Sequence, residues 1–355
     1  MDQASAHILF SALKIAVFSI GGVRLFEEVF LSYFPLGVLI IVAIVCSVFY
    51  YRVPPPSSDV VEAILGKDLS EIDNGSSQYV VKTVAHRGAG LDAPENTLAA
   101  FKMCKDKGCD FIEFDVCLTA DGVPIVFHDS STGRMADLDL VINEKNWADL
   151  CNINLSAKHP FKDRYPQTNI PTLDQTVNQL LAAGQRMFID IKDNDTKMVK
   201  VILDLFEKYP ELESKALVTS FYPFLIYQIR RKNPNIVCSM AWRPYAFIYE
   251  SFNYAQGPGP RRAKTWYLHL YLQICDILQE WLLPRVTYYF LGLSVILLHK
   301  DALGPKTILD WRNKGVRVMA WTVNSPIEKQ YLAKVLKITY LTDTFTGESS
   351  THSGL

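Results

Sequence analysis

The sequence predicts an α/β fold built on a parallel sheet, and two observations support this. Apolar runs of strand length recur along the chain, and amphipathic helical stretches lie between them. The runs cover 112–118, 187–191, 216–220, 237–242, 295–299 and 316–323, and the clearest helical stretches are 196–209 and 306–314. This alternation is typical of parallel strands joined by crossover helices.

One pair of runs departs from the alternation. The runs that begin at Ile112 and Val123 are joined only by Thr119-Ala120-Asp121-Gly122. A crossover helix does not fit into four residues, and Asp-Gly is typical of a hairpin turn. We therefore expect one of these two runs to be an antiparallel addition to the parallel sheet.

The first 52 residues carry the clearest membrane signal. Leu31–Tyr51 is almost wholly apolar and uncharged, and about twenty such residues span a bilayer. We expect residues 1–52 to form a membrane region with a transmembrane helix at about 31–51. A signal peptide is the weaker alternative, because a long lead precedes the run and no clear cleavage site follows it. The earlier run Ile8–Val23 carries Lys14 and is either an interfacial helix or a second span.

The next segment, 53–78, is predicted to be a linker because it opens with Pro54-Pro55-Pro56. With a single span, the basic residues Lys14 and Arg24 precede the membrane and Arg52 follows it. That asymmetry favours a cytoplasmic N-terminus and a lumenal or extracellular remainder. With two spans, the remainder would lie on the same side as the N-terminus.

Other sequence features limit the possible functions. The net charge of −1 gives no electrostatic case for binding nucleic acid. The seven cysteines are odd in number and lack metal-binding spacing, and the sequence does not tell whether any of them form disulfides. Three Asn-x-Ser/Thr glycosylation sequons, at Asn74, Asn154 and Asn194, fit a lumenal placement.

Two carboxylates on a strand suggest a metal site. Glu113 and Asp115 lie two residues apart in an apolar run, so their side chains project from the same strand face. Burying two such groups is costly unless a cation lies between them, and hard oxygen ligands select Mg²⁺ or Ca²⁺. The alternative is a pair of solvated acids on the polar face of a half-buried strand.

Two histidines and an arginine complete the inventory. His86 and His128 each follow an apolar run, where an imidazole exchanges protons near neutral pH, although a structural role is the commoner one. Arg87 offers a planar fork suited to phosphate oxygens. Together with the acids, these residues suit metal-assisted attack on a phosphodiester.

The ordered set of motifs resembles the glycerophosphodiester phosphodiesterase family over about residues 80–343. The matching motifs are His-Arg-Gly at 86–88, Pro-Glu-Asn-Thr at 94–97, Glu-x-Asp at 113–115, His-Asp at 128–129, Asp-x-Lys at 190–192 and Trp-Thr-Val-Asn at 321–324. The third acid, Asp190, departs from the glutamate that most of the family carries. Because aspartate is shorter, we expect the cation to lie nearer that strand or to keep an extra water.

The resemblance implies a TIM-type (β/α)8 barrel, here 79–346 with a tail at 347–355, whose site lies at the carboxyl ends of the strands. It implies one divalent cation, with Mg²⁺ favoured and Ca²⁺ possible. The implied roles are metal ligation for Glu113, Asp115 and Asp190, phosphate binding for Arg87 and Lys192, and proton transfer for His86 and His128. The sequence does not tell which histidine is the base.

The mechanism implied is attack by a glycerol hydroxyl on the neighbouring phosphate, followed by hydrolysis of the cyclic glycerol phosphate. The aspartate at 190 and the membrane segments resemble the membrane-bound, glycerophosphoinositol-hydrolysing branch. The alternatives are a lysophospholipase D-like activity on lysophospholipids or N-acyl glycerophosphoethanolamines, and an inactive membrane scaffold.

Four residues near the motifs receive smaller roles. Glu95 and Asn96 are expected to be structural, with Asp92 or Asn96 capping a helix at 97–107. Trp321 and Asn324 either line the mouth of the site or serve ordinary packing and capping.

The segment 244–291 is predicted to be a membrane-associated helical insertion. Its polar residues His269, Gln273, Asp276 and Glu280 form one narrow helical stripe, and apolar residues cover the rest. A single crossing of the bilayer would separate strands that belong to one sheet. We therefore expect this helix to lie in the interface or to re-enter and return, rather than to span. The alternative is an ordinary helix buried on the barrel.

Overall fold

The computed structural model describes residues 3–67 and 83–348, and it divides into two compact units, Met1–Arg52 and Val53–Leu355. The first unit is a single helix, α1 (Gln3–Tyr51), which includes both apolar runs of the sequence. Within the described residues, Phe34–Tyr51 is the one helical stretch long and apolar enough to span a bilayer, with a mean hydropathy of 2.4. It falls inside the predicted span.

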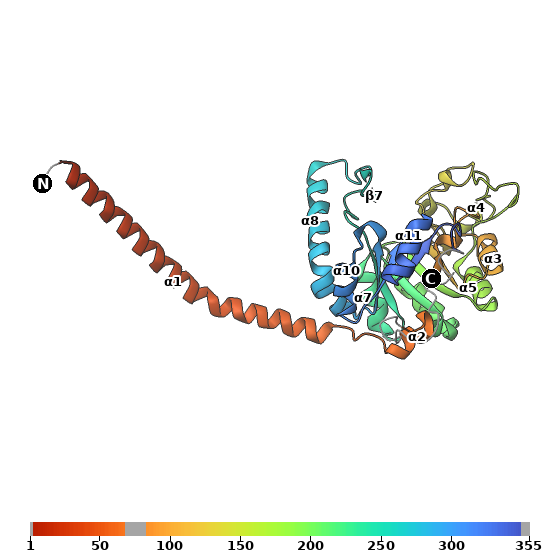
Figure 1. The fold of residues 1–355 in the computed structure, drawn as a ribbon, viewed down its shortest axis with the longest axis horizontal. Helices are drawn as coiled ribbons and strands as arrows, with labels where there is room; N and C mark the ends of the chain where they lie inside the picture. The colour runs from red at the N-terminus through yellow and green to blue at the C-terminus, as the bar shows by residue number, and fades with distance from the viewer. Residues whose placement is uncertain (1–2, 68–82, 349–355) are drawn as a thin grey trace. The chain divides into compact units, whose positions relative to one another are not determined.

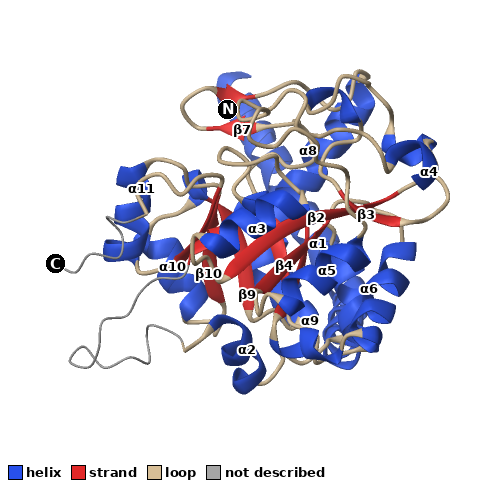
Figure 2. Ribbon diagram, turned by 90° about the vertical axis from the view of Figure 1, so that its right-hand side faces the viewer, coloured by secondary structure: helices blue, strands red, loops and turns tan. Residues whose placement is uncertain are grey.

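The second unit is a closed barrel of eight parallel strands, as the resemblance implied (Figure 2). The strands are β1 (Thr83–Ala85), β2 (Phe111–Leu118), β4 (Arg186–Ile191), β5 (Ala216–Ser220), β6 (Cys238–Trp242), β9 (Val295–His299), β10 (Arg317–Trp321) and β11 (Thr339–Thr342). Their order around the barrel is β1-β11-β10-β9-β6-β5-β4-β2, and pairing of β1 with β2 closes it. The predicted TIM-type fold is confirmed.

The antiparallel addition is β3 (Pro124–Val126), which pairs with the outer end of β2 through Val116 and Val126. The predicted hairpin is therefore confirmed, with Gly122 at its turn in a left-handed conformation (φ 79°). Because β3 begins beside Leu118 at the carboxyl end of β2 and runs back to Val116, the residues that follow it approach Asp115, and the N–H of Phe127 donates to the Asp115 carbonyl at 3.0 Å.

Helices cover the outside of the barrel because each buries one apolar stripe against the strands. In α6 (Lys197–Lys208), for example, Met198, Ile202 and Leu205 are buried at helical spacing. The other covering helices are α3 (Leu98–Asp106), α5 (Leu173–Ala182), α7 (Pro223–Lys232), α10 (Pro305–Arg312) and α11 (Pro326–Gln330), and a short α4 (Trp147–Leu150) lies in the loop after β3.

Part of the predicted linker is a helix of the barrel unit. Helix α2 (Ser58–Leu65) buries Val61, Ile64 and Leu65 in the same core cluster as Phe111 and Val237. These strand residues lie at the amino-terminal end of the barrel, so α2 closes that end (Figure 1). The linker assignment was therefore wrong for 58–65, because the short apolar stripe after the prolines was overlooked, and 68–78 lie outside the described residues.

The long insertion lies between β6 and β9, which are neighbours in the barrel. It contains a small hairpin, β7 (Phe252–Asn253) with β8 (Gly257–Pro258), and then α8 (Trp266–Leu282). Leu283–Thr287 forms a π-helical turn that continues into α9 (Tyr288–Leu291). Figure 1 shows α8 in cyan along one side of the barrel.

The sequons differ in accessibility. Asn194 is exposed, whereas Asn154 is half-buried and its side chain bonds the backbone of Pro166 and Thr168. Asn74 and the tail beyond residue 348 lie outside the described residues.

Candidate active site

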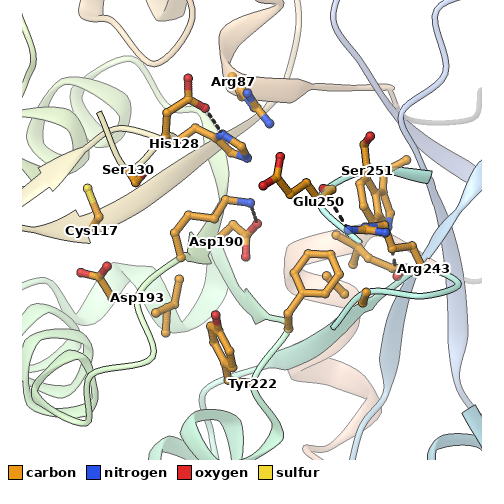
Figure 3. A pocket seen from close by; sticks show the side chains of 18 of the residues that line it. Arg87, Cys117, His128, Ser130, Asp190, Asp193, Tyr222, Arg243, Glu250 and Ser251 are labelled. Carbon is orange, nitrogen blue, oxygen red and sulfur yellow. Dashed lines mark hydrogen bonds and ion pairs between the residues drawn. The ribbon is translucent and has the colours of Figure 1, made fainter. Parts of the chain in front are cut away.

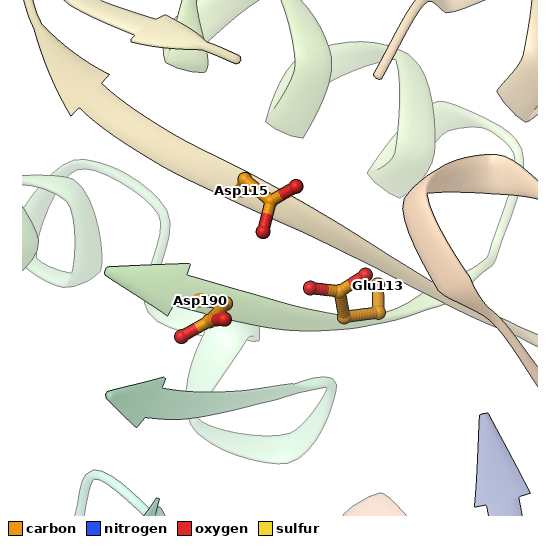
Figure 4. A group of neighbouring side chains, drawn as sticks. All are labelled: Glu113, Asp115 and Asp190. Atoms are coloured by element: carbon orange, nitrogen blue, oxygen red, sulfur yellow. The ribbon is translucent and has the colours of Figure 1, made fainter. Parts of the chain in front are cut away.

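Three carboxylates converge inside the barrel, as the resemblance implied. Glu113 and Asp115 project inward from β2, and the parallel register places Asp190 of β4 beside Asp115. Ligand oxygens of the three lie within 4.8 Å of one another, and each side chain is buried (Figure 4). Acids held this close repel one another, so the site is suited to a cation.

The electrostatics of the three acids are unequal. Burial, together with the charge of Asp115, raises the pKa of Glu113 to about 8. Burial also raises the pKa of Asp190. Burial acts in the same direction on Asp115, but the nearby cations Lys192 and Arg87 outweigh it and hold the pKa of Asp115 below its ordinary value.

The donor set fits a divalent cation. Oδ1 of Asp190 is buried and accepts no hydrogen bond from any described residue, which leaves a lone pair in the site unsatisfied. Carboxylate oxygens are the ligands that Mg²⁺ and Ca²⁺ prefer. In their present arrangement, Lys192 Nζ neutralises part of the charge, lying 2.9 Å from Asp115 Oδ1 and bonding Asp190 Oδ2.

Arg87 enters the site from a tight turn. The turn His86–Gly88 follows β1, and Arg87 takes a left-handed conformation (φ 53°). Its backbone N–H donates to Glu113 Oε2 at 2.8 Å, and its guanidinium donates to Glu95 Oε1 at 2.9 Å. Glu95 therefore holds the Arg87 side chain, which fits the structural role expected for it.

The two histidines differ in their surroundings. His86 Nδ1 lies 2.6 Å from Asp343 Oδ1, and its Nε2 lies 3.9 Å from Glu113 Oε2. Burial opposes the charged imidazolium, but Glu113 and Asp343 outweigh it and raise the pKa of His86. His128 Nδ1 lies 2.6 Å from Asp129 Oδ1, and burial lowers the pKa of His128 despite Asp115.

Sequence reasoning gave no role to Asp343 or Arg134, and it named Asn324 only as a residue of the site mouth or a cap. Asp343 Oδ2 accepts from Asn324 Nδ2 at 2.8 Å, so Asn324 fixes the acid that orients His86. Arg134 donates to Asp129 Oδ2 at 2.6 Å and also bonds Glu95. Arg134 belongs to none of the motifs. Because it lies 39 residues from Glu95 in the sequence, no local spacing predicts their contact.

The expected helix cap at 97–107 was wrong. Thr97 caps α3 by accepting from the N–H of Ala100 at 3.2 Å. Asn96 is instead fully buried in a left-handed conformation (φ 56°), and its Nδ2 donates to Asp115 Oδ2 at 2.7 Å while its Oδ1 accepts from the Asp115 N–H. Asn96 is structural, as expected, because it fixes a carboxylate of the candidate metal site.

One pocket collects these groups (Figure 3). Six of the seven predicted site residues line it, and Asp115 lies fully buried behind them. The lining residues are His86, Arg87, Glu113, His128, Asp190 and Lys192. The pocket therefore brings together in space the side chains that the sequence motifs singled out.

The opposite wall of the pocket was not predicted, apart from the possibility raised for Trp321. Phe221, Tyr222, His299 and Trp321 supply an aromatic surface, and the insertion adds polar and apolar groups above it. Arg243, which follows β6, is buried and donates to the backbone carbonyls of 244, 245, 249 and 250. The guanidinium of Arg243 therefore holds the backbone at the start of the insertion in place, where residues 246, 247 and 250 line the pocket.

Comparison with known proteins agrees with this geometry. Residues 86–345 match the model of the glycerophosphoryl diester phosphodiesterase family. The chain belongs to this family. It is 30% identical to glycerophosphodiester phosphodiesterase 1 of Homo sapiens, over 77% of this chain and 80% of that protein. The Bos taurus protein of the same name is 32% identical over 74% of this chain and 78% of its own length.

A solved structure shares the fold. An Oleispira antarctica phosphodiesterase in complex with the product sn-glycerol-3-phosphate aligns with a TM-score of 0.60 and 21% identity, covering 77% of this chain and 98% of that one. Family membership, with the residues at the site, identifies this chain as an enzyme, a glycerophosphodiester phosphodiesterase.

Proposed function

We propose that this phosphodiesterase uses one divalent cation, Mg²⁺ in preference to Ca²⁺, and hydrolyses glycerophosphoinositol to glycerol 3-phosphate and inositol at a membrane. The observation that carries the proposal is the convergence of Glu113, Asp115 and Asp190 within 4.8 Å, next to two histidines that each pair with an acid. These three acids would hold the cation, which when bound neutralises charge on the phosphate.

The cationic side chains Arg87 and Lys192 bind the phosphate oxygens in this proposal. Both line the pocket and both now neutralise site carboxylates, so they are already oriented toward the place where negative charge gathers. Charge-assisted hydrogen bonds from these groups stabilise the charge that builds on the phosphate in the transition state.

The histidines transfer the protons. One accepts the proton of the glycerol hydroxyl whose oxygen bonds to phosphorus, and the other gives a proton to the alcohol oxygen as its bond to phosphorus breaks. Each has its Nδ1 engaged by an acid, Asp343 or Asp129, which leaves Nε2 for the substrate. Water then opens the cyclic glycerol phosphate by the reverse proton transfers.

A polar head group suits the second wall of the pocket, where Tyr222, Glu250 and His299 offer hydrogen-bonding groups beside aromatic faces. A second function, lysophospholipase D-like hydrolysis, is favoured by a different observation. Leu272 of α8 also lines the pocket, and the outer face of that helix is apolar, which suits a substrate that carries an acyl chain.

The direct test measures glycerol 3-phosphate released by purified full-length protein from glycerophosphoinositol and from a micellar lysophospholipid, with Mg²⁺, Ca²⁺ or chelator. We expect release that requires the metal, favours glycerophosphoinositol and is lost in Glu113→Ala. Asp174→Ala, which removes an exposed acid of α5, is the matched control. Release that persists in chelator would contradict the metal proposal, and faster release from the lysophospholipid would select the second function.

We also propose that the catalytic unit is lumenal or extracellular. The basic residues around the apolar segment favour this side, and the exposed sequon at Asn194 would then carry a glycan. A mobility shift on glycosidase treatment that disappears in Asn194→Gln is the expected result. A glycosidase-insensitive protein, with residue 194 accessible to labelling from the cytoplasm, would place the unit on the opposite side.

A further inference from the structure

Helix α8 turns its apolar face outward. None of its residues is buried, and its large apolar side chains are among the most exposed in the barrel unit. Trp266 is 77% exposed, Tyr271 61% and Ile277 60%. Leu268, Leu270, Ile274, Leu278 and Trp281 belong to the same surface, which we call the outer face of α8. Contiguous apolar surface of this kind marks an interaction site.

Polar contacts on the opposite side of the helix set this orientation, because they attach that side to the rest of the insertion. Asp276 accepts hydrogen bonds from the backbone N–H groups of Phe247 and Ile248 at 2.9 and 3.0 Å. The ring of His269 stands edge-on to Tyr249. The polar stripe therefore contributes its residues at 269 and 276 to the insertion, and the large apolar side chains of the outer face stay 43–77% exposed.

The contacts of α8 exclude a transmembrane role. Asp276, near the middle of the helix, is held against the irregular backbone at Phe247 and Ile248, whereas a helix in the bilayer core would face lipid or other helices there. The insertion also leaves the barrel after β6 and returns at β9, which is the adjacent parallel strand. Both ends of the helix therefore lie on the same side of any bilayer.

The base of α8 is fastened to the point where the barrel unit begins. Val53, the residue that follows α1 and Arg52, donates its N–H to the carbonyl of Phe290 at 2.9 Å. Arg230 is buried and binds the carbonyls of Pro54 and Leu291. Because α8 continues through the π-helical turn into α9, the first two residues of the barrel unit are held at the root of α8.

The composition of α8 and its flanks matches a lipid interface. Aromatic side chains stand near both ends of the outer face, at Trp266 and Trp281, and aliphatic ones lie between them. The exposed basic residues Arg261 and Lys264 precede the helix, and Arg285 follows it. Basic groups around an apolar helical face attract anionic lipid head groups.

We propose that α8 lies in the plane of a bilayer surface with its outer face among the lipid chains. This inference deepens the proposed function, resting on its placement of the enzyme at a membrane. Leu272 and Phe247, from the insertion, line the substrate pocket. Docking of α8 therefore brings the pocket wall to the lipid surface.

Tryptophan fluorescence in the full-length protein tests the proposal without any assay of activity. Residues 1–52 contain no tryptophan, so the signal comes only from the barrel unit. The protein is reconstituted into phospholipid vesicles whose acyl chains carry bromine, which quenches nearby indoles. We expect strong quenching in the wild type and loss of at least half of it in W266F/W281F.

Other occupants of the outer face give different results. Quenching by aqueous acrylamide but not by brominated lipid would show that the outer face is in water, and would overturn the proposal. Protection from both quenchers would show that protein covers it, such as a second copy of this chain, and would equally overturn it. Equal bromine quenching in wild type and W266F/W281F would do the same.

A charge variant links docking to turnover. I274E/I277E places acids on the outer face, and Ile327→Glu, at an 80% exposed residue of α11, is the matched control. We expect I274E/I277E to lose bromine quenching at least twofold while the control does not, and to keep its turnover of soluble glycerophosphoinositol. If turnover of the soluble substrate fell together with the quenching, the variant's fold would be damaged. In that case the quenching of W266F/W281F decides whether the outer face contacts lipid. If brominated lipid quenched the wild type but no substrate released glycerol 3-phosphate, docking would be supported and only the proposed function would be contradicted.

Discussion

The two walls of the substrate pocket are built in different ways. One wall comes from β1, β2, β4 and the β3 hairpin, and it carries the charged residues His86, Glu113, His128 and Lys192. The other comes from β5, β6, β9, β10 and the insertion, and it carries the aromatic side chains of the pocket, Phe221, Tyr222, Phe247, Phe252 and Trp321, among other polar and apolar groups. We call them the charged wall and the aromatic wall. The charged wall suits chemistry on the phosphate that all substrates share, and the aromatic wall suits recognition of what differs between them.

The largest expected effect comes from removing an acid of the charged wall. Asp190→Ala should lower kcat/KM by about 1,000-fold or more, because a bound cation contributes several kcal/mol to the transition state. Asp190→Glu restores the family's usual acid and should retain most of the activity. Steady-state release of glycerol 3-phosphate measures both, and equal losses in the two variants would show that the carboxylate itself is not the needed group.

Loss of a proton-transfer group should rank next. His128→Ala should reduce kcat by about 100- to 1,000-fold, with KM little changed, since general acid–base catalysis contributes on that scale. His86→Ala should behave similarly. Full turnover in His128→Ala would eliminate the two-histidine mechanism.

An acid that orients a histidine should matter less than the histidine. Asp343→Asn keeps the shape of the side chain but removes the charge beside His86 Nδ1, and we expect a loss in kcat of about tenfold. Asn324→Ala, which releases Asp343, should show a smaller loss in the same direction. If Asp343→Asn changed only KM, Asp343 would belong to substrate binding rather than to positioning.

A change on the aromatic wall should affect recognition instead. His299 lines the pocket at the end of β9 and stands edge-on to Trp321. His299→Ala should raise KM for glycerophosphoinositol by about fivefold, near 1 kcal/mol, while kcat stays within about twofold. Comparison with a second head group sharpens the test. A fall in kcat equal to that of His128→Ala would erase the distinction between the walls.

The smallest effect concerns stability and pH. Burial opposes ionisation of Asp129, but hydrogen bonds from His128 and Arg134 outweigh it and hold the pKa of Asp129 below its ordinary value of 3.8. A carboxylate with a lowered pKa stabilises the fold above that value and loses the effect as the pH falls toward the folded pKa. The wild type should therefore exceed Asp129→Asn by about 1 kcal/mol in free energy of unfolding at pH 6.

Denaturant unfolding in detergent at a series of pH values measures that difference. It should stay constant between about pH 5 and 7 and shrink below the ordinary aspartate value of 3.8. A difference that grows on acidification would reverse the sign of the argument and exclude Asp129 as its source.

The contrast between the walls also explains what the sequence predicted. Glu113 and Asp115 share a strand face by the period of two, and parallel register places Asp190 beside them, so local patterns suffice for the charged wall. Arg134 and Asp343 were missed because no spacing connects them to the histidines they serve. Arg243 was missed because it binds carbonyl groups, which every residue type provides.

The helix α2 shows the same limit at the other end of the barrel. Helix α2 buries only three residues, and so short an apolar pattern does not predict a helix beside three consecutive prolines, which are typical of a linker. The helix forms because its apolar residues pack against Phe111 and Val237 at the amino-terminal end of the barrel, and this contact cannot be predicted from local sequence. The hairpin of β2 and β3, by contrast, followed directly from a four-residue connection.

The hydrogen bonds of Arg230 determine where a truncated form of this enzyme should begin. The match to the family begins at residue 86, and a shortened protein designed on that boundary would lack Val53, Pro54 and α2. Nη2 of the fully buried Arg230 would then lose the Pro54 carbonyl that accepts its hydrogen bond, and the core would lose Ile64. A catalytic fragment suited to crystallography or screening therefore begins at Val53, thirty-three residues before the first catalytic motif at His86.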